Sequence, residues 1–79
     1  MVKNKAQSMA AQTADLLIEY ITTNQMLPGD RMPTEAELIE KMGVSRSTIR
    51  EAIRILSARN ILEIRQGSGA YISPRQGHP

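Results

Sequence analysis

Apolar residues recur along most of this chain at the three- and four-residue spacing that places them on one face of a helix. The spacing predicts a helix from residue 7 or 8 to residue 23 or 24, a short helix over residues 35–42 and a third helix over residues 45–58. Residues 61–65 and 70–73 are instead rich in β-branched and aromatic side chains, which is typical of short strands. The pattern therefore predicts a mainly α fold in which three helices precede a small two-stranded β-hairpin.

Residues with capping preferences stand at the predicted helix boundaries. Thr34 and Glu37 have the spacing of a capping box, in which each side chain satisfies a backbone N–H at the start of the helix. Gly43 can take the left-handed conformation that ends this helix, and Ser45 can cap the next one. Asn60 stands where the third helix needs a left-handed cap at its end. These positions predict a tight turn between the second and third helices and a reversal of the chain before the hairpin.

The segment between the first two helices is predicted to form a turn followed by a short extended stretch. Pro28 and Gly29 occupy the positions that suit a type II turn. Arg31 and Met32 have room only for a short pairing segment before the next proline. The acids at positions 35 and 37 are interpreted as capping and helix-dipole groups rather than as a catalytic acid/base pair.

The third predicted helix has two chemically different faces. One face is apolar and can pack against a core, whereas the other offers guanidinium groups and hydroxyls. A helix, a tight turn and a second helix form a helix-turn-helix, whose second helix enters the major groove of DNA. The apolar face carries Ile49, Ala52, Ile53 and Leu56, and the polar face carries Arg46, Arg50, Arg54 and Ser57, with Ser47 beside them.

The composition excludes several kinds of site. The 79 residues suffice for one small domain, and the absence of cysteine rules out disulfides, thiolate metal sites and cysteine nucleophiles. The only histidine, His78, is interpreted as an unstructured residue near the end of the chain. No enzyme activity, metal site or cofactor is therefore expected. With no membrane-spanning segment or signal peptide in view, a soluble cytoplasmic protein without a membrane partner is expected.

Charge is distributed unevenly along the chain. Residues 15–40 carry six acids and one base, a net charge of −5, whereas residues 41–65 carry six bases and two acids, a net charge of +4. Such a molecule can meet a polyanion with one side, although charge alone equally allows a solvated basic face without a partner.

Residues 1–7 are predicted to form a flexible arm, residues 8–73 the folded domain, and residues 74–79 a linker or disordered tail.

Three ordered motifs, PGDRMPTEAEL, GVSRSTIREAI and RQGSGAYI, together resemble the DNA-binding domain of GntR-family bacterial transcription regulators. The resemblance spans residues 7–73 and is closest to the FadR-type branch, and it implies a winged helix-turn-helix fold. One departure is Ala36, where many relatives have a phosphate-binding arginine. This departure removes a contact with DNA phosphate. It is also expected to leave the neighbouring acids at positions 35 and 37 unrelieved, with no adjacent arginine to offset their negative charge.

The resemblance also implies which residues meet DNA. Arg46 matches an arginine that reads a guanine edge in the major groove, and Arg50 matches one that holds a backbone phosphate. Hydroxyl side chains at the start of the third helix match contacts to phosphates or bases, and the wing tip matches a segment that enters the minor groove. The expected DNA-binding residues are Thr34, Ser45, Arg46, Ser47, Thr48, Arg50, Arg65, Gln66 and Gly67.

The leading interpretation is sequence-specific binding to double-stranded DNA by a bacterial transcription regulator, a repressor that responds to a metabolite. The resemblance implies near-palindromic operator DNA bound by a homodimer, and a small-molecule effector that binds a C-terminal domain missing from this sequence. The 79 residues alone are expected to be monomeric or weakly associating and to dimerise chiefly on DNA. The alternative is a winged-helix module that binds other proteins without specific DNA binding.

Overall fold

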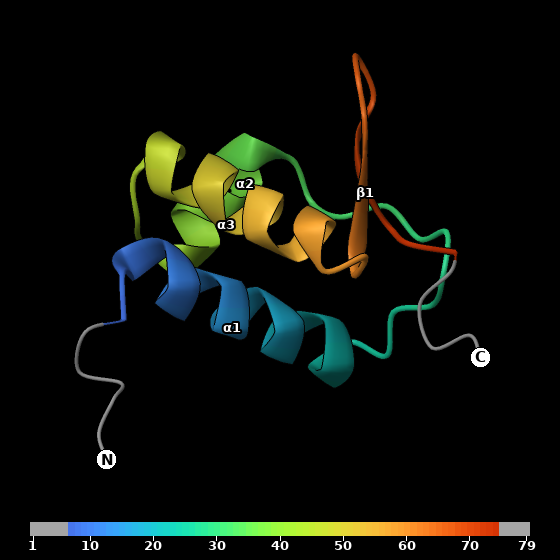
Figure 1. Ribbon diagram of the computed structural model, residues 1–79, viewed down its shortest axis with the longest axis horizontal. Coiled ribbons are helices and arrows are strands. Elements are labelled where there is room, and N and C mark those ends of the chain that lie inside the picture. Colours follow the sequence, from blue (N-terminus) through green and yellow to red (C-terminus); the bar gives the residue numbers. More distant parts are fainter. Residues whose placement is uncertain (1–6, 75–79) are drawn as a thin grey trace.

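The computed structural model describes residues 7–74 and confirms the predicted winged-helix architecture (Figure 1). Helices α1 (Met9–Thr23), α2 (Glu35–Met42) and α3 (Arg46–Ala58) are followed by strands β1 (Leu62–Arg65) and β2 (Gly69–Ile72). Figure 1 shows α1 lying along one side of α2 and α3, while the β-hairpin stands upright beside the C-terminal end of α3.

A single aliphatic core joins the three helices to the base of the hairpin. Helix α1 packs mainly on α3, and α2, which lies behind α3 in Figure 1, also packs on it. The four apolar residues predicted for the inner face of α3 are all buried, as the helical spacing requires. The buried core consists of Ala14, Leu17, Ile21, Met32, Leu38, Ile49, Ala52, Ile53, Leu56, Leu62 and Ile72.

The predicted caps fix the ends of α2 and α3. The Thr34 hydroxyl accepts from the Glu37 backbone N–H at 3.1 Å, and the Glu37 carboxylate accepts from the Thr34 backbone N–H at 2.8 Å. Gly43 ends α2 at φ +69°, and the Ser45 hydroxyl accepts from the Thr48 backbone N–H at 3.2 Å. The capping box, the left-handed glycine and the serine cap are confirmed. Together they hold α2 and α3 in the helix-turn-helix arrangement.

The segment after the first turn pairs with the wing through an isolated β-bridge. Gly29 has φ +92°, as a type II turn requires, and the Asp30 backbone N–H donates to the Leu27 carbonyl at 2.9 Å. Arg31 then pairs with Tyr71 of β2 as an isolated antiparallel bridge. The predicted turn and pairing segment are confirmed, and they tie the wing to the chain that precedes α2.

The hairpin differs slightly from its predicted boundaries. Asn60 takes the expected left-handed conformation at φ +63°, and β1 begins two residues later, at Leu62. Arg65 pairs with Gly69, so β2 begins at Gly69 and the loop holds only residues 66–68 instead of four residues. Gly67, at φ +77°, lets this short loop close without steric strain.

The predicted flexible arm and tail lie almost entirely outside the described residues. Residue 7 is the one arm position that the structure places, and its side-chain amide donates to the Asp15 carboxylate at 3.1 Å. The tail segment 75–79, with His78, is not described.

Candidate nucleic-acid interface

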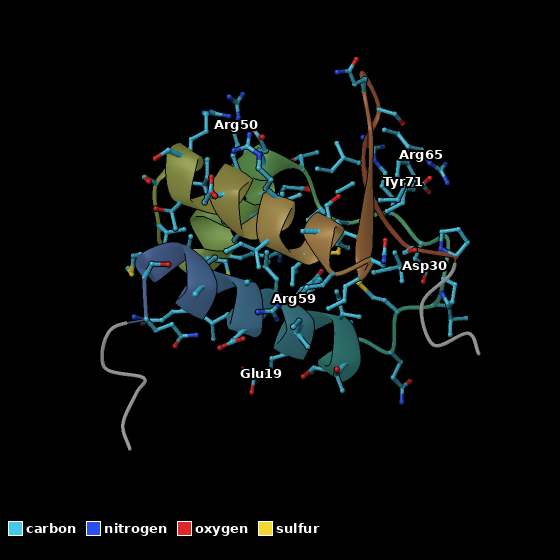
Figure 2. The ribbon with its side chains drawn as sticks, viewed as in Figure 1. Glu19, Asp30, Arg50, Arg59, Arg65 and Tyr71 are labelled. Atoms are coloured by element: carbon cyan, nitrogen blue, oxygen red, sulfur yellow. The ribbon has the colours of Figure 1, made fainter. Side chains whose placement is uncertain are left out.

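A hollow of about 450 Å³ lies between the exposed side of α3 and the wing. Ile53 and Ile64 give this hollow an apolar part, and arginines stand around it. Figure 2 shows Arg50 projecting outward from α3 on the same end of the molecule as the wing tip. The lining residues are Glu35, Arg50, Ile53, Arg54, Ile64, Arg65, Gln66, Gly67, Gly69 and Ala70.

The two arginines expected to meet DNA share one carboxylate. Arg46 Nη1 lies 3.0 Å from Glu35 Oε1, and Arg50 Nε lies 3.0 Å from Glu35 Oε2. The arginine side chains remain about three-fifths exposed, at 59% and 60%, whereas the Glu35 side chain is 34% exposed. The guanidinium groups are therefore accessible to a ligand while a residue of α2 holds them one helical turn apart.

The pKa of Glu35 reflects this arrangement. Partial desolvation opposes ionisation, but the hydrogen bonds and charges of Arg50 and Arg46 outweigh it and lower the pKa of Glu35 below its ordinary value. The carboxylate is therefore ionised at neutral pH. The expectation that the acids beside Ala36 are unrelieved is wrong, because Glu35 pairs with two arginines and Glu37 accepts from the Thr34 backbone.

Hydroxyl groups gather at the N-terminal end of α3. The Ser45 hydroxyl lies 3.2 Å from the Ser47 hydroxyl and 3.0 Å from that of Thr48. Ser45 and Ser47 are exposed and Thr48 is half-buried. Because the first amides of a helix and its dipole favour negative charge, this end of α3 is suited to an anionic partner. Thr34 is exposed at the start of α2, where its hydroxyl serves the capping box.

The wing tip presents Gln66 and Gly67 to solvent, as predicted. Unlike these two residues, Arg65 makes side-chain contacts within the wing. Its guanidinium lies 4.2 Å from the centroid of the Tyr71 ring and also pairs with Glu63 at 3.1 Å. Figure 2 shows Arg65 and Tyr71 together on the side of the wing that is turned away from α3. Arg65 therefore lines the hollow at its edge without directing its charge toward α3.

Sequence reasoning missed two residues that support the wing tip. Arg31 Nη2 donates to the Ser68 carbonyl at 2.8 Å, and the Tyr71 hydroxyl is hydrogen-bonded to the Ser68 hydroxyl. The extended segment at Arg31 was predicted, but its partner on the wing is 37 residues away in the sequence. Only the arrangement of β2 beside that segment brings these groups together.

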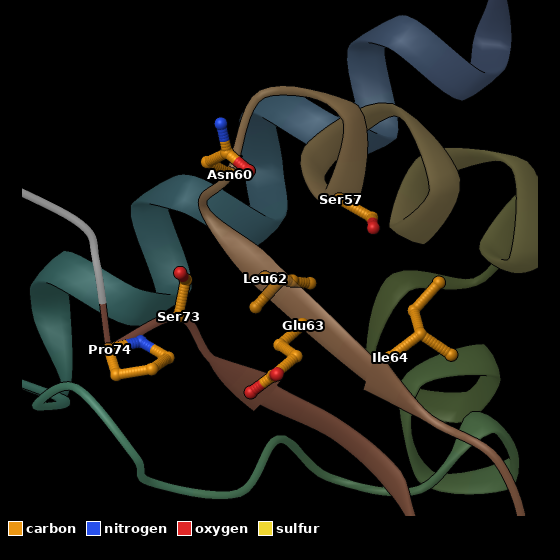
Figure 3. Close-up of a pocket in the computed structure, with 7 residues that line it drawn as sticks. All are labelled: Ser57, Asn60, Leu62, Glu63, Ile64, Ser73 and Pro74. Carbon is orange, nitrogen blue, oxygen red and sulfur yellow. The ribbon is translucent and has the colours of Figure 1, made fainter.

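A second hollow, of about 300 Å³, lies at the base of the wing (Figure 3). Its residues carry no cationic group, and its single carboxylate, that of Glu63, pairs with Arg65. Within residues 7–74, no group of three or more His, Cys, Asp or Glu side chains could hold a metal ion. This hollow is lined by Ser57, Asn60, Leu62, Glu63, Ile64, Ser73 and Pro74.

Residues 9–72 match the family described as bacterial regulatory proteins, gntR family. The chain belongs to this family. It is 48% identical over 61 residues to the mannosyl-D-glycerate transport/metabolism system repressor MngR of Escherichia coli strain K12, covering 77% of this chain and 25% of that protein. The predicted family is thus confirmed, and its members are transcription regulators rather than enzymes.

Solved structures agree with this assignment. Streptococcus agalactiae GntR is 53% identical with a TM-score of 0.82, over 86% of this chain and 33% of that one. The AraR DNA-binding domain, solved in complex with operator ORX1, is 33% identical with a TM-score of 0.78, over 91% of this chain and 87% of that one. This chain therefore shares the fold of a DNA-binding domain and belongs to a family of transcription regulators, and it spans about a quarter of the MngR repressor's length. No helix in the described part is long and apolar enough to span a membrane.

Proposed function

We propose that this domain recognises a specific operator by inserting the N-terminal part of α3 into the major groove and the wing into the adjacent minor groove. A protein that occupies both grooves must straddle the sugar–phosphate backbone between them. The hollow between α3 and the wing offers a place for that backbone, since Arg50 and Arg54 stand beside it and Ile64 gives it an apolar surface. The position of this hollow between α3 and the wing is the main support for the proposal.

Individual roles follow from the chemistry of each side chain. Arg46, near the start of α3, has the planar fork that can donate two hydrogen bonds to a guanine edge. Arg50, one turn further along, is placed to neutralise a backbone phosphate.

Smaller groups complete the proposed contact. The hydroxyls and free amides at the start of α3 suit phosphate oxygens, whereas the narrow tip of the wing suits the minor groove. Arg65 is assigned to the phosphates that flank the wing, because its guanidinium lies on the wing's outer side. This set comprises Ser45, Ser47, Thr48, Arg65, Gln66 and Gly67, together with Thr34 at the start of α2.

The intact regulator is proposed to be a repressor that binds a near-palindromic operator as a homodimer. The relative MngR is named a repressor, which supports this assignment. The effector is proposed to be a small metabolite that binds a domain outside these 79 residues, because the part of MngR that this chain matches is only 25% of that protein.

Selection of bound duplexes from a random DNA library tests the function directly. We expect a symmetric sequence with a G·C pair in each half-site, and an electrophoretic shift that is stronger on this sequence than on a scrambled duplex. Equal affinity for the selected and the scrambled duplex would contradict the proposal and favour the protein-binding winged helix.

A further inference from the structure

Glu35 lies between α2 and the two arginines of α3 that are proposed to meet DNA. It is the first residue of α2, and its two carboxylate oxygens accept separately from Arg46 and Arg50 of α3, each at 3.0 Å. Within residues 7–74, it is the one acid that forms ion pairs with two arginines. The groups proposed to meet DNA are therefore already in contact with an oxyanion.

We propose that Glu35 is a specificity-determining residue that competes with DNA phosphates for Arg46 and Arg50 and so suppresses binding to unmatched sequences. This inference rests on the proposed function. A carboxylate resembles a phosphate as an acceptor of guanidinium N–H groups. Any duplex must either displace Glu35 from the arginines or bring its phosphates close to a negative charge.

The competition acts unequally on matched and unmatched DNA. Binding to unmatched DNA depends almost entirely on phosphate charge, and this is the term that the Glu35 carboxylate opposes. Binding to a matched site adds base contacts, which depend on how Arg46 is oriented. Glu35 engages only Nη1 of Arg46, one part of its five-donor fork, so it can orient this arginine while other N–H groups meet a guanine.

The size of the effect follows from the exposure of the pairs. Exposed ion pairs change an equilibrium by roughly 1.5- to 5-fold each. Two such pairs involve Glu35. We therefore expect Glu35→Gln to bind an unmatched duplex about 3- to 10-fold more tightly than the unmodified domain at ~0.1 M salt, where screening still permits short-range interactions.

Glu40 provides a matched control. It lies on the same helix, is exposed, and forms no ion pair within the described residues. Glu40→Gln changes the net charge by the same amount as Glu35→Gln without releasing an arginine. Any difference between the two variants therefore reports the local contact rather than the overall charge.

The experiment measures the affinity of both variants for the library-selected duplex and for a scrambled duplex of the same length and composition. We expect Glu35→Gln to lower the ratio of matched to unmatched affinity by about 3- to 10-fold, and Glu40→Gln to change it by less than about 2-fold. Equal ratios for the two variants, or weaker binding of the scrambled duplex by Glu35→Gln, would overturn the proposal.

A second measurement does not depend on sequence-specific binding. On immobilised heparin, a sulfated polyanion, Glu35→Gln should elute at higher salt than Glu40→Gln because its two arginines are released. Identical elution would show that Glu35 does not mask them. If the unmodified domain fails to prefer any duplex, the proposed function fails, and the heparin comparison still decides whether Glu35 competes with polyanions.

Discussion

Arg31 is predicted to hold the wing tip in position for DNA, and its replacement by alanine tests this role. The guanidinium donates to the Ser68 carbonyl at 2.8 Å and lies beside Gly69, where an added Cβ would be 3.3 Å from Arg31 Nε. Truncation removes these contacts but leaves the backbone pairing intact, since the Met32 N–H donates to Ala70 and the Ile72 N–H donates to Asp30. The wing should therefore remain attached at its base while its tip becomes more mobile.

The magnitude is limited by solvent exposure. One hydrogen bond contributes about 0.5–1.5 kcal/mol in a folded protein, and Arg31 is exposed, which favours the low end of this range. We expect Arg31→Ala to lower the free energy of unfolding by less than about 1 kcal/mol. The local opening of residues 66–68 should become about 3- to 5-fold more frequent, because the lost hydrogen bond restrains only that segment.

The assay combines amide hydrogen exchange with DNA binding. The Ser68 N–H, which donates to the Arg65 carbonyl at 2.9 Å, should exchange faster in Arg31→Ala, and affinity for the selected duplex should fall. Arg59→Ala is the control, because it removes the same charge from an exposed side chain that forms no ion pair among the described residues. If both variants lose the same affinity and Ser68 exchanges at its original rate, Arg31 contributes only its charge.

Three further predictions concern base readout, the core and acid stability. Arg46→Ala should lose about 1–3 kcal/mol of specific binding free energy and relax the preference for one G·C pair in each half-site. Arg50→Ala should instead weaken binding to all DNA sequences alike and reduce the salt dependence of binding. Selection and shift assays at several salt concentrations distinguish these results. Leu56→Ala, at a fully buried position, should lower the free energy of unfolding by about 2.7–5 kcal/mol in urea titrations, and a loss below 1 kcal/mol would contradict its place in the core. Hydrogen bonding from the Thr34 backbone lowers the pKa of Glu37 below its ordinary value, so the stability that this carboxylate contributes is present above the unfolded pKa and lost as pH falls through the folded pKa. Glu37→Gln should reduce this acid-dependent loss of stability in urea titrations at stepwise lower pH.

The elements could be predicted from the sequence because their determinants are local. Thr34 and Glu37 are three residues apart, and the left-handed positions Gly43 and Asn60 each mark a helix end without reference to distant parts of the chain. The hairpin loop was predicted one residue too long, because Gly69 can serve either as a loop residue or as the first residue of a strand. Only pairing with Arg65 decides between these two roles.

Side-chain partners across elements could not be predicted in the same way. Glu35 is 11 and 15 residues from the two arginines it contacts, so its role depends on how α2 crosses α3. The direction of Arg65 depends on which face of the hairpin is turned toward α3. Strand alternation places Arg65 on the same face as Glu63, but the pattern of polar residues does not specify that face.

The two parts of the proposed interface differ in how firmly the fold holds them. The face of α3 that carries Arg46 and Arg50 lies opposite completely buried side chains, including Ile49 and Leu56. Glu35 links this face to α2 through ion pairs with both arginines. The wing tip at residues 66–68 is exposed and depends on strand pairing and on a few contacts from Arg31 and Tyr71. A rigid helix keeps base-reading groups in a fixed register, whereas a loosely held tip can adapt to minor grooves of different width at an entropic cost. Sequence discrimination is therefore expected to reside mainly in α3, with the wing contributing affinity that varies with the shape of the DNA.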